Sequence, residues 1–253
     1  MGNVIDVKGL CKTYIVNKYS NNVLRNIDFS LKEGEFITIM GPSGSGKSTM
    51  LYTVSGMDRA TSGDIEFMNQ NLADLNSKEL AKIRLINMGF IFQQMYMMKK
   101  LCILDNILLP GYHAELVSRA KVREEAETMM RRLGIIEIAD NKVTEVSGGQ
   151  LQRACLCRAL INHPKVLFAD EPTGALNSKA AGEVMNELIN VNRDGTAILM
   201  VTHSARVAAA SERVIYLIDG HIEGEIELGK LETEAELGAR ERKINKWLME
   251  QGW

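Results

Sequence analysis

The stretch GPSGSGKST, residues 41–49, follows the apolar run EFITIM (35–40) and precedes MLYTVSGM (50–57). It satisfies the pattern G-x-x-x-x-G-K-[ST], which requires a strand before it and a helix after it. Glycines let the backbone turn so that successive N–H groups converge on phosphate oxygens, and the positive end of the following helix adds to the attraction. We expect this phosphate loop to hold a nucleotide through Gly41, Pro42, Ser43, Gly44, Ser45, Gly46, Lys47, Ser48 and Thr49.

Two side chains of the phosphate loop have a specific chemistry. The Lys47 ammonium is expected to reach the outer phosphates, and the Ser48 hydroxyl is expected to ligate Mg²⁺. Taken alone, the motif could be a glycine turn that opens an ordinary helix. Its position between a predicted strand and a predicted helix favours nucleotide binding.

The run VLFADEP (166–172) places two carboxylates at the end of another predicted strand. Ligands of open α/β sheets bind at the carboxyl ends of the strands. We expect Asp170 to hold Mg²⁺ through water and Glu171 to polarise the attacking water as the catalytic base. The alternative is an acidic pair that faces solvent. Together with Lys47, the pair indicates hydrolysis of the nucleotide as well as its binding.

The apolar pattern predicts an α/β fold. Short continuous apolar runs separated by helical patterns are typical of parallel strands with helices on both faces, and they occur at 35–40, 88–92, 165–169, 196–202 and 213–218. Shorter and more alternating runs at 3–10, 23–31 and 63–68 predict a small antiparallel sheet near the N-terminus.

The strand signal disappears between Met95 and Asn141. The segment SRAKVREEAETMMRRLG (118–134) has helical periodicity, with Ser118 as a plausible cap and Gly134 as a plausible stop. We therefore expect a helical subdomain at about 95–160, inserted in the α/β core.

The composition is that of an ordinary soluble globular protein, with 45% hydrophobic and 25% charged residues among 253. A formal net charge of -2 argues against binding nucleic acid through bulk charge, so no nucleic-acid partner is expected. No apolar run approaches the roughly 20 residues of a membrane span, and no export signal is visible. The spacing of the four cysteines fits no zinc site, so we expect reduced packing residues in a cytosolic protein.

The segment VSGGQLQR (146–153) narrows the class, because it resembles the signature of the ATP-binding-cassette (ABC) family, whose usual form is L-S-G-G-Q. Glycines before a helix again form an anion-receptive N-terminus. The resemblance implies a head-to-tail homodimer in which each ATP lies between one chain's phosphate loop and the other chain's signature. The signature residues expected to contact nucleotide are Ser147, Gly148, Gly149 and Gln150.

Further motifs match the family in order. Tyr14 in CKTY matches the aromatic residue that stacks on adenine, although it could equally be an ordinary strand tyrosine. Gln93 in FIFQQ matches the glutamine that senses Mg²⁺ and the attacking water, with Gln94 as the second choice. The loop GALNSK (174–179) matches the one that communicates across the dimer, and His203 in VTHS matches the histidine that contacts the γ-phosphate.

The chain departs from the family pattern at three positions. Val146 replaces leucine before the signature, which is a small apolar change. Asn177 stands where many cassettes carry aspartate, so a charged contact across the dimer becomes an uncharged hydrogen bond. Ser204 follows the histidine where aspartate is frequent. The catalytic set is retained, which implies two competent sites in a homodimer.

The resemblance extends from Asn3 to about Glu223. It implies a P-loop NTPase (RecA-like) parallel-sheet core with an N-terminal antiparallel β subdomain and the inserted helical subdomain. We expect an ABC ATPase domain at 1–228 and a helical tail at 229–253.

The sequence in and around these motifs is similar to that of the macrolide-exporter and lipoprotein-release group of ABC ATPases. The tail ERKINKWLMEQGW (241–253) is similar to the bacitracin and lantibiotic peptide-resistance branch of that group. This implies a bacterial Mg²⁺-dependent ATPase at the cytoplasmic face of the cell membrane. Closure of its dimer would drive a separate transmembrane permease and confer antibiotic resistance. The alternatives are a lipoprotein-release or cell-division type of ATPase and a soluble cassette outside transport.

Two segments leave their partners open. In the tail, Ile244, Trp247, Leu248 and Gln251 have helical spacing, which suits packing on the same chain, on a dimer mate or on a permease. The methionine-rich segment 93–112 could be an adaptable surface for a permease or ordinary core.

Overall fold

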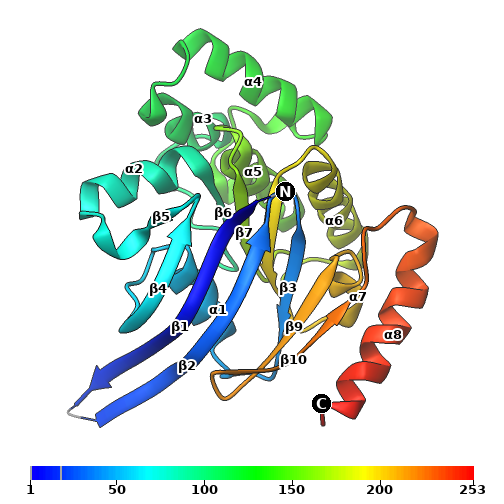
Figure 1. Cartoon of the computed structure of the whole chain (residues 1–253). Helices are drawn as coiled ribbons and strands as arrows, with labels where there is room; N and C mark the ends of the chain where they lie inside the picture. The colour runs from blue at the N-terminus through cyan, green and yellow to red at the C-terminus, as the bar shows by residue number, and fades with distance from the viewer. Residues whose placement is uncertain (1, 18) are drawn as a thin grey trace.

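The computed structural model describes residues 2–17 and 19–253 and contains a six-stranded sheet in the order β10-β9-β3-β8-β7-β6 (Figure 1). The parallel strands are β9 (Arg213–Ile218), β3 (Phe36–Met40), β8 (Ala197–Val201), β7 (Val166–Asp170) and β6 (Met88–Ile91). Strand β10 (His221–Glu227) pairs antiparallel with β9 at one edge. The prediction of parallel strands from the apolar runs is confirmed.

Every residue of β3, β7 and β8 is buried because both faces of the sheet are covered. Ile37 and Ile39 point to the face that packs on α1 (Lys47–Val54), whereas Phe36 points to the opposite face. That opposite face packs on α5 (Gly148–Leu160) and α6 (Ser178–Arg193), which explains the unbroken apolar runs.

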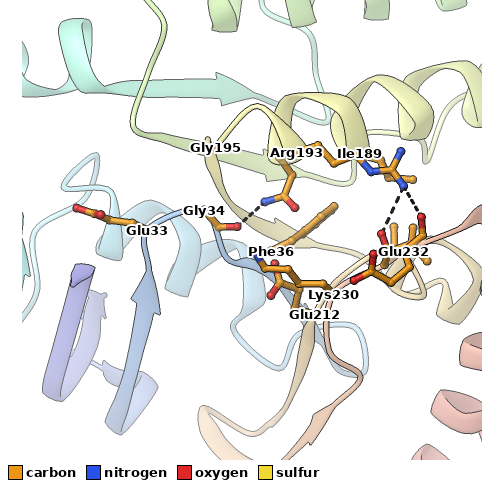
Figure 2. A pocket seen from close by; sticks show the side chains of 12 residues that line it. Glu33, Gly34, Phe36, Ile189, Arg193, Gly195, Glu212, Lys230 and Glu232 are labelled. Carbon is orange, nitrogen blue, oxygen red and sulfur yellow. Dashed lines mark hydrogen bonds between the residues drawn. The ribbon is translucent and has the colours of Figure 1, made fainter. Parts of the chain in front are cut away.

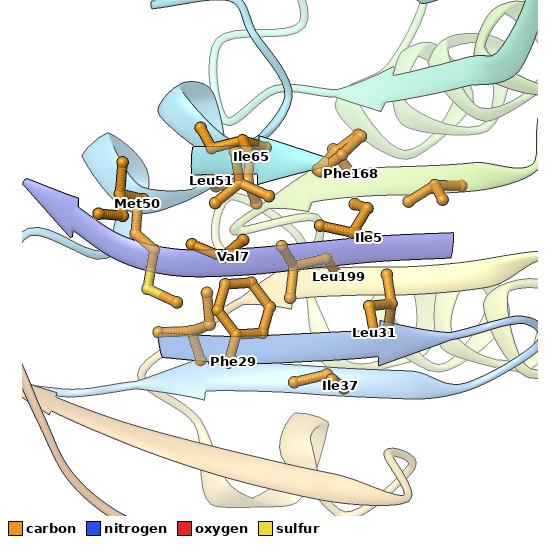
Figure 3. Close-up of a cluster of buried hydrophobic side chains, with 14 of the residues drawn as sticks. Ile5, Val7, Phe29, Leu31, Ile37, Met50, Leu51, Ile65, Phe168 and Leu199 are labelled. Atoms are coloured by element: carbon orange, nitrogen blue, oxygen red, sulfur yellow. The ribbon is translucent and has the colours of Figure 1, made fainter. Parts of the chain in front are cut away.

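A second, antiparallel sheet has the order β2-β1-β4-β5. Its strands are β1 (Asn3–Val16), β2 (Tyr19–Lys32), β4 (Ser62–Phe67) and β5 (Gln70–Asn71). Its apolar side chains, among them Ile5, Val7 and Phe29, pack onto α1 and the parallel sheet (Figure 3). The antiparallel sheet was predicted, but β1 and β2 are longer than the predicted runs. The outer part of their hairpin is exposed, so its sequence has no alternating apolar pattern that would predict a strand.

Helix α2 (Ser77–Asn87) precedes β6, and the helical insertion follows that strand with α3 (Ile103–Ala114), α4 (Arg119–Arg132) and α5. Ser118 caps α4 by accepting a hydrogen bond from the Lys121 amide at 3.4 Å, and Gly134 follows the helix with φ of 61°. The predicted cap and stop of this helix are therefore confirmed.

All four cysteines are free, and two of them are buried in this region. Burial raises the pKa of the Cys155 thiol to about 11 and that of Cys157 to about 12. These thiols are packing residues, as predicted, because the thiolate form is suppressed at neutral pH.

The tail forms α8 (Leu237–Glu250), which packs beside β9 and α7 (Ala205–Ala208) on its own chain (Figure 1). Ile244 and Leu248 are buried there against Met40 and Tyr216. Of the alternatives for the tail, the structure therefore supports packing on the same chain. Among the described helices, none is long and apolar enough to cross a lipid bilayer.

Candidate active site

Three adjacent strands of the parallel sheet deliver the predicted site residues to one edge. The phosphate loop follows β3, Asp170 is the last residue of β7, and His203 comes two residues after β8 ends at Val201. Because parallel strands end on the same side, residues far apart in the sequence meet there. Hydrogen bonds between the loop-side helix α1 and Asp170, and between Glu171 and His203, show this convergence directly.

The phosphate loop needs glycine at specific points. A Cβ on Gly41 would lie 2.1 Å from the Leu217 carbonyl oxygen, which is far closer than any real contact. Gly46 is the N-cap of α1 with φ of 102°, a left-handed conformation, and no side chain caps the helix. The first amides of α1 therefore remain available to an anion.

The Lys47 ammonium is folded over this loop. Its Nζ donates a hydrogen bond to the Pro42 carbonyl oxygen at 2.7 Å. Burial lowers the pKa of Lys47, and the nearby carboxylates of Glu171 and Asp170 oppose that shift. The cation is thus held at the mouth of the loop, where a phosphate could replace the carbonyl as its partner.

Asp170 is buried, with 3% of its surface exposed, and both of its oxygens are engaged. Ser48 Oγ donates to Oδ1 at 3.0 Å and the Tyr52 hydroxyl donates to Oδ2 at 2.7 Å. Burial, together with the bond to Asp170, raises the pKa of Tyr52, so its proton stays in place. Tyr52 was not predicted; its spacing of four from Ser48 on a helix is the only signal in the sequence.

Glu171 and His203 form the second pair of the site. His203 Nδ1 lies 2.8 Å from Glu171 Oε1, and Thr202 Oγ1 donates to Glu171 Oε2 at 3.3 Å. Glu171 has φ of 47°, which is strained for a residue with a side chain and typical of functional sites. Thr202, which sequence reasoning missed, thus helps to orient the predicted base.

Tyr14 lies on β1 and is held by a partly buried ion pair. Its hydroxyl donates to Asp58 Oδ2 at 2.5 Å, while Lys12 Nζ donates to Asp58 Oδ1 at 2.6 Å and lies 4.6 Å from the centre of the Tyr14 ring. Burial alone would raise the pKa of Asp58, but the hydrogen bonds from Lys12 and Tyr14 lower it overall. Lys12 and Asp58 were not predicted and fix the orientation of this ring.

Gln93 follows β6, which ends at Ile91 beside β7, so it lies at the same edge of the sheet as Asp170. Its side chain is exposed, and within residues 2–17 and 19–253 no hydrogen bond ties it to the site. The structure therefore places Gln93 near the predicted metal ligands without engaging it.

The signature segment stands apart from this cluster. Ser147 is the N-cap of α5, where its hydroxyl accepts from the Gln150 amide at 3.3 Å and Gln150 Oε1 accepts from the Ser147 amide at 2.9 Å. Gly148 is exposed, Gly149 is partly exposed, and no hydrogen bond joins residues 147–150 to the phosphate loop anywhere in the described chain. Asn177 similarly caps α6 by accepting from the Ala180 amide at 3.0 Å.

The donor set near Asp170 fits Mg²⁺. Ser48 and Asp170 supply oxygens, which that ion prefers. Elsewhere in the phosphate loop, the buried Ser45 hydroxyl has no hydrogen-bond partner in the described chain. Within the same residues no group of three or more His, Cys, Asp or Glu side chains is placed to hold a metal ion, so the protein alone offers no closed cage. Such a partial set is typical of Mg²⁺ sites that substrate phosphates complete.

A separate cavity of about 420 Å³ lies at the other end of the parallel sheet (Figure 2). It is lined by Phe36, the first residue of β3, and by charged side chains that include Arg193, Glu212 and Lys230. None of the predicted site residues lines it. The strand-end cluster, and not this cavity, is the candidate active site.

Comparison with known proteins agrees with this geometry. The family model described as ABC transporter matches residues 24–174. MJ0796 of Methanocaldococcus jannaschii, an ABC transporter ATP-binding protein, is 40% identical over 229 residues, which cover 89% of this chain and 97% of that protein. Its dimeric structure matches with a TM-score of 0.84 over 90% of this chain and 100% of that one. A second dimeric structure of MJ0796, in a post-hydrolysis state bound to ADP and Pi, gives a TM-score of 0.81.

Two further relatives differ in what they export. The bacitracin export ATP-binding protein BceA of Halalkalibacterium halodurans is 39% identical over 227 residues, which cover 89% of each chain. The macrolide export ATP-binding/permease protein MacB of Escherichia coli is 40% identical over 222 residues, 88% of this chain but 34% of that longer protein. The match to the family model over more than half of the chain, and to relatives along most of it, shows that this chain belongs to the ABC transporter family and is one of its ATP-hydrolysing cassettes.

Proposed function

We propose that the chain is the ATP-binding and ATP-hydrolysing subunit of a bacterial ABC transporter of the antimicrobial-peptide resistance or export type. It works as a homodimer at the cytoplasmic face of the membrane and drives a separate permease. One observation carries the dimeric part of this proposal. The phosphate loop and Glu171 converge within one chain, whereas the signature at the start of α5 stays exposed and separate. A second copy is needed to bring a signature to each nucleotide.

The residues of the site have distinct tasks in hydrolysis. The amides of the phosphate loop and the Lys47 ammonium bind the outer phosphates of ATP. Glu171 accepts a proton from the attacking water. The water oxygen forms a bond to the γ-phosphorus while the bond from that phosphorus to the ADP oxygen breaks. His203, held by Glu171 at 2.8 Å, orients that carboxylate and contacts the γ-phosphate.

Mg²⁺ would be held by Ser48, by Asp170 and by Gln93, and when bound it neutralises charge on the phosphate oxygens. Tyr14 stacks on adenine with its ring fixed by Asp58. Ser147, Gly148, Gly149 and Gln150 of the second copy close over the nucleotide. Hydrolysis detaches the γ-phosphate from ADP, so one nucleotide no longer bridges the two copies and the dimer reopens.

The unit that performs this work is the ABC ATPase domain at 1–228, with a helical subdomain at about 95–160. The tail at 229–253 is an addition to it, and α8 packs onto the sheet side that carries Met40. Because Met40 directly precedes the phosphate loop, the tail supports the strand that positions the loop.

The peptide-resistance assignment is the finer part of the proposal. The match to BceA covers nearly nine-tenths of both chains, whereas the match to MacB covers only the ATPase third of a fused protein. Similarity to BceA along nearly the whole of that protein supports the BceA-like assignment. Lipoprotein-release or cell-division ATPases remain the competing assignment.

The dimer is tested with Glu171→Gln, which removes the base but keeps the size of the side chain. We expect it to bind ATP, to form a stable dimer in ATP by light scattering after gel filtration, and to lose nearly all turnover. Glu124→Gln, on the exposed face of α4, is the matched control and should turn over normally. Rapid hydrolysis by Glu171→Gln would refute the assigned base, and a monomer in saturating ATP would refute the shared site.

The branch is tested by purifying the protein from membranes and identifying the permease that accompanies it. A permease with a large extracellular domain and many transmembrane helices supports the peptide-resistance assignment. A small permease with few helices supports the lipoprotein-release or cell-division alternative.

A further inference from the structure

Tyr52 contacts the carboxylate at the centre of the site although no motif of the sequence includes it. Its hydroxyl donates to Asp170 Oδ2 at 2.7 Å, while Ser48 Oγ donates to the other oxygen, Oδ1, at 3.0 Å. Ser48 and Tyr52 are four residues apart on α1 and lie on the same face of that helix. Each oxygen of one buried carboxylate is therefore held by a hydroxyl of the same helix.

The ring of Tyr52 is itself held by aromatic neighbours. Its centre lies 6.2 Å from that of Phe92, Phe92 stacks on Phe90 at 5.8 Å, and Phe90 stacks on Phe168 at 5.3 Å. Phe168 belongs to β7, two residues before Asp170. The packed rings thus connect α1 to the strand that carries the carboxylate, which fixes the hydroxyl relative to its acceptor.

Both hydroxyls matter because Asp170 is almost inaccessible to water. With 3% of its surface exposed, a carboxylate oxygen that lost its donor could not replace it with bulk solvent. Ser48 reaches only Oδ1, so Tyr52 is the donor for Oδ2 within the part of the chain that the structure describes. A carboxylate that meets a metal through water must keep its orientation, and the donors behind it set that orientation.

We propose that Tyr52 is a positioning residue for Asp170. Its hydroxyl holds Oδ2, so that Oδ1 faces Ser48 and the phosphate loop in the geometry needed for Mg²⁺. This rests on the proposed function, in which Asp170 holds that ion. Partners that orient metal-binding carboxylates typically contribute 10- to 100-fold to metal affinity or activity.

The test compares Tyr52→Phe with the wild type in two calorimetric titrations. A non-hydrolysable analogue takes the place of ATP in both titrations: it is titrated in EDTA, and MgCl₂ is then titrated into protein saturated with it. Tyr52→Phe keeps the ring and its packing and removes only the donor. We expect the Mg²⁺ midpoint to rise about tenfold while the affinity for the analogue in EDTA changes less than twofold. Tyr112→Phe removes a tyrosine hydroxyl from α3 and serves as the matched control, with both titrations unchanged.

The outcomes separate this proposal from the proposed function. An unchanged or lower Mg²⁺ midpoint in Tyr52→Phe overturns the positioning role, and so does an equal loss of affinity with and without Mg²⁺, which indicates general damage. If the wild type itself binds the analogue equally well with and without Mg²⁺, the proposed function fails first. Near-ultraviolet circular dichroism and the thermal midpoint show that the variant is folded before either titration is interpreted.

Discussion

The chain contains two glycine-rich helix starts that are built in opposite ways. At the phosphate loop, Gly46 caps α1 in a left-handed conformation and no side chain caps the helix. At the signature, Ser147 caps α5, and Gln150 returns a hydrogen bond to the Ser147 amide. No side chain accepts a hydrogen bond from the first amides of α1, whereas Ser147 accepts one from an amide in the first turn of α5.

The two segments also differ in how closely the rest of the chain packs around their glycines. A Cβ on Gly46 would lie 2.9 Å from the Val23 carbonyl oxygen, whereas a Cβ on Gly148 would meet nothing within 4 Å. The phosphate loop is thus shaped by its own chain, and the signature presents an open helix end. The difference supports the proposal that the phosphate loop binds nucleotide within one chain and that the signature meets the nucleotide of a second copy.

The largest effect on ATP binding is expected at Lys47, the cation of the phosphate loop. Lys47→Ala removes a charge-assisted contact to phosphate of about 1.5–3 kcal/mol, so ATP affinity should fall roughly 10- to 100-fold and hydrolysis should be lost. Titration with a fluorescent ATP analogue measures the affinity. Lys78→Ala, an exposed lysine in the first turn of α2, is the control and should bind normally. Unchanged affinity in Lys47→Ala would show that the loop is not the phosphate site.

Features that depend on residues close together in the sequence could be predicted, and those that depend on distant residues could not. Apolar runs and the glycine-lysine pattern are local, so the parallel strands and the phosphate loop were predicted within a residue or two. The hairpin of β1 and β2 was predicted too short, because its exposed outer half has no buried face to mark it.

Contacts between distant residues could not be predicted. Tyr52 meets Asp170 across 118 positions, and Lys12 meets Asp58 across 46, so only the folded packing of α1 and the strands brings them together. Resemblance to a family supplied the roles of residues that match a motif. It assigned no role to Tyr52, Thr202 or Asp58, which hold those residues through hydrogen bonds.

A methyl group added at each glycine-rich helix start should have very different effects on stability. Gly46→Ala places a side chain at φ of 102° against Val23 and should reduce the free energy of unfolding by about 1–3 kcal/mol. Gly148→Ala adds its methyl in open space, so the free energy of unfolding should change by less than about 0.5 kcal/mol. Urea unfolding measures both.

The two alanines should also differ in the step that they block. Gly46→Ala should weaken ATP binding by the single chain. Gly148→Ala should bind ATP normally and lose hydrolysis, since in the proposed dimer its methyl lies where the second copy closes. Equal loss of ATP binding in both variants would mean that the signature and the phosphate loop of one chain bind the same nucleotide, and would contradict the proposed dimer.

The smallest effect concerns the cap that distinguishes the signature. Ser147→Ala removes the acceptor for the Gln150 amide and should reduce the free energy of unfolding by about 1 kcal/mol, which corresponds to about 2–4 °C in Tm. Ser118→Ala removes the equivalent cap of α4 at 3.4 Å and should reduce stability by a similar amount. Only Ser147→Ala should also lose hydrolysis, because in the proposed dimer only that cap faces the nucleotide of a second copy. Differential scanning calorimetry with a phosphate-release assay separates the two roles; full turnover in Ser147→Ala would leave the serine as a helix cap alone.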